Sequence, residues 1–122
     1  MNFEVLEPEF VICKIESFEE VSIHDEFCFI TKTDEEISLI CTTRYTPQRT
    51  IAIQKNYRGI RLKGPLEFNT VGTIAKLISL LSLNDISVLS VSTYNSEYIF
   101  LKNSRLGKAV DILIANNYEL IG

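Results

Sequence analysis

Few side chains in this sequence could carry out catalysis. His24 is the only histidine, so a serine–histidine or cysteine–histidine nucleophile would need it, and Asp25 and Glu26 beside it indicate an exposed acidic loop. The phosphate-binding motifs G-x-x-x-x-G-K-[ST] and G-x-G-x-x-G are absent from the sequence. The adjacent acidic pairs at 19–20 and 35–36 are typical of solvated surface charge. We therefore expect a protein that is not an enzyme.

Three thiols could bind a metal or form a disulfide: Cys13, Cys28 and Cys41. They are odd in number and lie inside apolar runs. The sequence has no C-x-x-C pair and no nearby histidine at a spacing that would suit zinc. Thiols in such surroundings behave as small core residues. We expect all three to be buried and reduced, with no metal and no cofactor.

The charge is unevenly distributed along the chain, which has a net charge of −4 and a pI near 5.0. Residues 1–36 hold 11 acidic and 2 basic side chains, whereas residues 37–122 hold 5 acidic and 10 basic ones. These segments either form two solvated faces or attract each other, within a chain or between subunits. The basic residues are scattered and no aromatic stripe accompanies them, so we expect no nucleic-acid partner.

Membrane segments are not indicated. No apolar run reaches the roughly 20 residues that cross a bilayer, and the start Met1-Asn2-Phe3-Glu4 lacks the basic region and long apolar core of a signal peptide. We expect no membrane association and a cytoplasmic location.

The elements that position any site are clearest in the second half of the chain. Period-two and helical spacings predict strands and helices in alternation, with a hairpin turn at Tyr94-Asn95-Ser96 and a helix cap at Asn69 or Thr70. The expected strands cover 57–63, 86–93, 97–102 and 118–121, and the expected helices 70–83 and 104–115. This β-α-β-β-α-β order predicts an α+β, ferredoxin-like fold. RNA-binding modules share the plan, but their K/R-G-F/Y-G/A-F pattern is missing.

The first half of the chain follows the same plan in reduced form. It predicts a strand at 10–15, at most a short helix at 18–23, a hairpin of 27–32 with 37–41 about Asp34-Glu35, and a short closing strand at 51–53. The second helix is nearly absent, because Pro47 interrupts a stretch that has no apolar stripe. We expect a degenerate repeat over residues 1–56 and a complete one over residues 57–122.

Four segments of the second repeat form a recognisable series: GPLEFNTVGTIA from residue 64, ISV from residue 86, STYNSEYI from residue 92 and Ala109-Val110. Together they resemble the ACT domains of small bacterial proteins and of the CASTOR arginine sensors. The resemblance covers roughly residues 57–120 and keeps order and spacing throughout. The preceding FITKTDEEISLIC from residue 29 looks like the hairpin that comes before this domain in the same family. The predicted fold is therefore two tandem ACT-like repeats, the first degenerate.

The resemblance implies a regulatory fold in which domains pair side by side and hold small ligands, often amino acids, between them. The ligand would lie between the first βα loop of one domain and a strand of its neighbour. The site residues implied in this way are Asn69, Thr70, Val71, Gly72, Ser87, Val88, Thr93 and Glu97.

Each of these residues also has a purely structural interpretation. Gly72 could admit a ligand to the first helical turn or only ease helix-to-sheet packing. Thr93 could hold the hairpin turn, and Ser87 and Val88 could be ordinary strand residues. Glu97 stands where related sequences carry aspartate, which puts arginine itself in doubt as the ligand, and it could also be an exposed edge charge.

We predict a non-enzymatic regulatory module that binds a small-molecule ligand, an amino acid, at an ACT–ACT interface of a homodimer. The alternative is a structural or partner-binding protein that kept the fold without the ligand.

Overall fold

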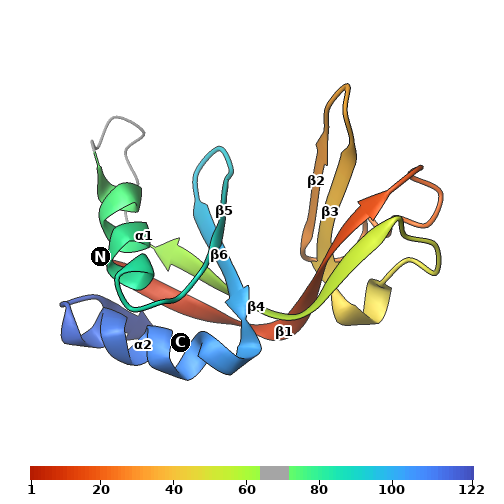
Figure 1. Cartoon of the computed structure of the whole chain (residues 1–122). Helices are drawn as coiled ribbons and strands as arrows, with labels where there is room; N and C mark the ends of the chain where they lie inside the picture. Colours follow the sequence, from red (N-terminus) through yellow and green to blue (C-terminus); the bar gives the residue numbers. More distant parts are fainter. Residues whose placement is uncertain (64–71) are drawn as a thin grey trace. The chain divides into compact units, whose positions relative to one another are not determined.

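The computed structural model describes residues 1–63 and 72–122, which divide into two compact units (Figure 1). The first unit contains Met1–Glu7 and Arg58–Gly122, and the second contains Pro8–Tyr57. The division is not sequential, because residues 1–7 group with the later part of the chain and not with residues 8–57.

The first unit is an α+β sheet with two helices. It contains the opening part of β1 (Asn2–Ile15), the closing part of β4 (Ala52–Lys63), α1 (Thr73–Ser82), β5 (Leu89–Ser92), β6 (Glu97–Lys102), α2 (Asn103–Ala115) and β7 (Glu119–Ile121). Within it β1 lies between β7 and β4, and β6 lies between β4 and β5. The predicted order from β4 to β7 and the α+β fold are confirmed. The sequence did not indicate that β7 pairs in parallel with β1, with Asn2 opposite Glu119.

The core of this unit lies between the sheet and the two helices. Residues four apart share one face of a helix, and α1 buries Leu77 and Leu81 while α2 buries Ala109 and Leu113. They pack in one cluster with Phe3, Ile60, Leu62, Ile99 and Leu101 of the sheet and with Ile86, which precedes β5.

The inward face of α1 differs from the predicted one. Helical spacing in the sequence predicts an inward apolar stripe of Val71, Ile74, Ala75, Ile78 and Leu81. In the structure Ala75 is exposed, whereas Leu77, which is outside that stripe, is completely buried. Apolar residues surround much of this helix, so several faces satisfy a helical period. The face with Leu77 and Leu81 packs against the core because burying a leucine removes more apolar area from water than burying an alanine does.

The second unit is a smaller sheet. It contains the rest of β1, β2 (Cys28–Lys32), β3 (Ile37–Thr42), a short 3₁₀ turn η1 (Thr43–Tyr45) and the start of β4, in the order β2-β3-β1-β4. The expected hairpin is confirmed, with the N–H of Thr33 donating to the carbonyl of Glu36 at 2.9 Å. Residues 18–23 contain turns and no helix, which is within the expected limit of at most a short helix.

The cysteines lie in the core of the second unit. Cys13 and Cys41 are buried beside Val11, Ile15 and Leu39, Cys28 packs against them, and all three are free thiols. Burial, followed by the nearby thiols and Asp25, raises the pKa of Cys41 to about 12. The predicted burial is confirmed for Cys13 and Cys41, whereas Cys28 is partly exposed.

Two strands are longer than the sequence indicated. β1 begins at Asn2 and not at Phe10, and Pro8 lies between its pairing with β7, which ends at Glu4, and its pairing with β3, which begins at Phe10. A residue without an N–H is tolerated in such a gap. β4 joins the two expected strands through Asn56, whose φ of 66° suits asparagine better than most residues.

Candidate ligand-binding site

The β5–β6 hairpin is the best-defined part of the site. Val91 pairs with Tyr98 and Ser92 with Glu97, and the N–H of Thr93 donates to the carbonyl of Ser96 at 2.9 Å. The predicted turn and the strand Glu97–Lys102 are confirmed. β5 begins at Leu89, three residues later than expected.

The side chain of Glu97 lies on the helix-covered face of the sheet, at the end of β6 next to this turn. Alternate residues of a strand share a face, so Glu97 lies in the row of Ile99 and Leu101, which are completely buried in the helix-covered core. The hydroxyl of Ser92 donates to Oε1 of Glu97. Oε2 of Glu97 is buried and has no hydrogen-bond partner among the described residues. An unpaired buried oxygen is costly, so a donor or a cation at this point would stabilise the hairpin.

Thr93, Ser87 and Val88 have mainly structural contacts. The hydroxyl of Thr93 donates to the carbonyl of Ser96 at 3.3 Å, which is the turn role. Ser87 and Val88 precede β5 in irregular chain, so their expected position inside a strand was wrong. Val88 packs against the core and Ser87 is exposed, which leaves their backbone groups for any ligand.

Gly72 precedes helix α1 in the left-handed conformation, with a φ of 78°. A Cβ added there would have no described heavy atom within 4 Å, so no described residue crowds this position. Its carbonyl accepts the N–H of Lys76 at 2.8 Å, and no side-chain cap from the described residues reaches the first turn of α1. The expected N-cap residues Asn69 and Thr70, and also Val71, lie outside the described residues.

The structure gathers part of the predicted site. Thr93 and Glu97 lie on one hairpin, and Figure 1 shows that its turn and the start of α1 lie at the same end of the first unit. A shallow apolar groove of about 440 Å³ runs from the start of α1 along its outer side and is lined by Gly72, Ala75, Lys76, Ser79, Leu80 and Leu83.

A cluster on the other face of this sheet was not singled out from the sequence. Arg61 donates to Oε1 of Glu4 from Nε at 2.8 Å, and its guanidinium lies 5.9 Å from the centre of the Tyr98 ring. The hydrogen bond to Tyr98, and then the bond and charge of Glu4, raise the pKa of Arg61, although burial opposes this. The excess of acids in residues 1–36 and of bases in residues 37–122 was the sequence signal for ion pairs between these segments. Arg49 pairs with Glu19 and Glu20, and Arg61 and Lys63 pair with Glu4, so these pairs join acids of residues 1–36 to bases of residues 37–122.

Metal sites and membrane spans are not found in the described part of the chain. No group of three or more histidine, cysteine or acidic side chains there could hold a metal ion. No described helix has the length and apolar character needed to cross a bilayer.

The hairpin and the two helices define a ferredoxin-like α+β domain. The sequence model of one family, described as "ACT domain", matches residues 52–115, more than half of the chain. The chain therefore belongs to the ACT domain family. No curated protein matches the sequence.

Solved structures share this fold over nearly the whole chain. Protein Atu0741 from Agobacterium tumefaciens is 25% identical, with a TM-score of 0.86 over 98% of this chain and 91% of that one. VC0802 from Vibrio cholerae, a protein of unknown function described as a possible transport protein, is 20% identical, with a TM-score of 0.73 over 93% and 88%. The regulatory subunit of aspartate kinase from Thermus thermophilus is 5% identical, with a TM-score of 0.67 over 94% and 96%, which shows the fold alone.

Proposed function

We propose that this protein is a non-enzymatic regulatory module that binds a small ligand, an amino acid, between the ACT domains of two copies of the chain. The observation that carries the proposal is the buried Oε2 of Glu97, which has no partner among the described residues. The family supports a regulatory role, since the same fold forms the regulatory subunit of an aspartate kinase.

The two ends of an amino acid suit the two parts of the site. Ser92 fixes one oxygen of Glu97, so the other oxygen can meet a cationic group of the ligand without reorganising the side chain. No side chain of the described residues caps the N–H groups of the first turn of α1, and these groups and the positive end of the helix dipole favour a carboxylate. In this proposal Gly72 admits the ligand to that turn, and the absence of described heavy atoms within 4 Å of an added Cβ supports this.

The remaining predicted residues have secondary roles in this proposal. Asn69, Thr70 and Val71 lie outside the described residues and are ligand contacts in this proposal only through the family resemblance. Ser87 and Val88 would offer backbone groups, while Thr93 holds the turn that positions Glu97.

A thermal-shift panel of free amino acids tests the proposal, because a ligand that binds only the folded state raises the melting temperature. We expect at least one amino acid to raise it in a concentration-dependent way, and arginine is one member of the panel. If none does so at millimolar concentration, the alternative of a partner-binding ACT protein replaces this proposal.

Glu97→Gln separates a ligand contact from a surface charge. Removing one partner of a desolvated charge pair reduces the binding free energy by a few kcal/mol, whereas an exposed charge contributes at most about 1 kcal/mol to it. We expect the affinity for a responsive cationic amino acid to fall at least about tenfold, equal to about 1.4 kcal/mol, in a calorimetric titration.

Asp111→Asn is the matched control, since Asp111 is an exposed acid on α2 of the same unit. It should leave the affinity unchanged. Equal affinities for the wild-type protein and Glu97→Gln would remove Glu97 from the site.

A further inference from the structure

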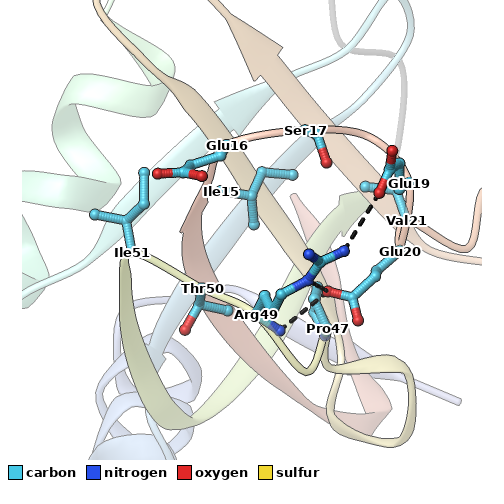
Figure 2. A pocket seen from close by; sticks show the side chains of 10 residues that line it. All are labelled: Ile15, Glu16, Ser17, Glu19, Glu20, Val21, Pro47, Arg49, Thr50 and Ile51. Carbon is cyan, nitrogen blue, oxygen red and sulfur yellow. Dashed lines mark hydrogen bonds and ion pairs between the residues drawn. The ribbon is translucent and has the colours of Figure 1, made fainter.

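The second unit contains a pocket that the ACT resemblance does not account for. Its volume is about 530 Å³, within the range of small-molecule sites. Two segments form it, residues 15–21 after the end of β1 and residues 47–51 before β4, both inside the second unit. Figure 2 shows the side chains that line it.

One part of the lining is apolar. Ile15 and Pro47 are buried, Val21 is partly buried, and Ile51 is 52% exposed at the rim. An apolar surface within a concave site favours a ligand with a hydrocarbon portion.

Polar contacts join the two segments across the pocket. The carboxylate of Glu20 accepts the backbone N–H groups of Gln48 at 3.2 Å and Arg49 at 3.0 Å. The guanidinium of Arg49 lies 3.3 Å from Glu19 and 3.7 Å from Glu20. The carboxylate of Glu20 therefore links the two segments through hydrogen bonds. The Arg49–Glu19 pair is 78% and 75% exposed, so it contributes little and can open.

The charge of the lining is unbalanced. The lining contains three carboxylates, those of Glu16, Glu19 and Glu20, but a single guanidinium, that of Arg49. Glu16 forms no ion pair within the described chain and, in Figure 2, lies on the opposite side of Ile15 from Glu19. Two carboxylates at the two ends of an apolar surface match a molecule with two cationic ends and a hydrocarbon middle.

We propose that this pocket binds a small aliphatic diamine. One ammonium meets Glu16, the other meets Glu19 after Arg49 moves aside, and the methylene chain lies against Ile15. This site is in the other unit from Glu97, so the inference does not rest on the proposed regulatory ligand.

Three probes of equal chain length test the charge and the hydrocarbon contact together. They are pentane-1,5-diamine, the neutral pentane-1,5-diol and the dianion glutarate, each titrated into the full chain by calorimetry at low salt. We expect the diamine to bind with a dissociation constant of about 1 mM or tighter, and the other two at least about tenfold more weakly. No binding of the diamine, or equal binding of the diol, would overturn the proposal.

Variants distinguish this pocket from general attraction to an acidic protein. Glu16→Gln should weaken diamine binding at least about fivefold, whereas Arg49→Gln should strengthen it because a competing cation is removed. Glu9→Gln, at an exposed acid on β1 of the same unit, should change nothing. If Glu9→Gln has the same effect as Glu16→Gln, the binding is nonspecific and the proposal is wrong.

A final variant separates this site from the one proposed above. Glu97→Gln should leave diamine affinity unchanged. Loss of diamine binding in Glu97→Gln would place the diamine at the hairpin and overturn the assignment to the second unit, while failure of the amino-acid panel would leave the diamine result standing.

Discussion

At the start of α1, residue 72 has a backbone conformation that only glycine adopts without strain. Its φ is 78°, and a Cβ there would meet open space within the described chain. A side chain is therefore opposed by backbone strain and not by a steric clash.

We predict that Gly72→Ala lowers the free energy of unfolding by about 1 kcal/mol, and that Gly72→Asn lowers it by less. Asparagine is larger than alanine but tolerates the left-handed region better. Urea denaturation of both variants checks the order. A greater loss for asparagine would mean that crowding, and not φ, selects glycine.

Buried thiols give the stability a dependence on alkaline pH. The folded pKa of Cys41 is raised from 9.0 to about 12. Below pH 9 both states keep the proton, whereas between about pH 9 and 12 only the unfolded chain releases it. Each such thiol then lowers the free energy of unfolding by about 1.4 kcal/mol per pH unit in this window.

We predict that the fall in stability above pH 9 is less steep in Cys41→Ala than in the wild-type protein, by about one proton. The variant is less stable at every pH because of its cavity, so the slopes and not the absolute values are compared. Denaturant titrations from pH 8 to 11 measure them. Parallel curves would show that Cys41 ionises at an ordinary pH.

At the scale of the element, α1 shows how tertiary packing selects one face of an apolar helix. Leu77 is completely buried, while Leu83 at the end of the same helix is 84% exposed. The two side chains are chemically identical, but folding buries nearly all of the surface of Leu77 and little of the surface of Leu83.

We predict that Leu77→Ala lowers the free energy of unfolding by about 2 to 5 kcal/mol, and that Leu83→Ala changes it by less than about 0.5 kcal/mol. Chemical denaturation followed by circular dichroism compares the two. Similar losses at both positions would mean that the outer face of α1 is also covered, for instance by a second copy of the chain.

For the whole molecule, the exposed features are those through which an ACT domain could pair. β5 lies at the end of the sheet order and exposes Leu89, and the outer side of α1 carries an apolar groove. Unpaired edges and apolar surface favour association with a like copy.

We predict a homodimer at micromolar concentration, measured by light scattering across a dilution series. A ligand bound between two copies must also tighten their association, because binding and assembly are linked. The amino acid that raises the melting temperature should therefore lower the dimer dissociation constant. A monomer at all concentrations, with or without that amino acid, contradicts this expectation.

The sequence by itself determined the local elements and the fold class. Strand β6, helix α2 and both hairpins follow from side-chain periodicity and turn residues within short windows, so the ferredoxin-like order and the Thr93–Glu97 turn could be predicted. The resemblance of residues 57–120 to ACT domains also indicated the family, and the family match agrees with it.

Only the tertiary structure decided what depends on contacts between distant residues. The pairing of β7 with β1 and the grouping of residues 1–7 with the later part of the chain join positions from its two ends. The buried, unpaired oxygen of Glu97 and the pocket of the second unit likewise arise where separate segments pack. Local periodicity cannot encode these features, because the burial of a side chain depends on which partners the fold brings to it.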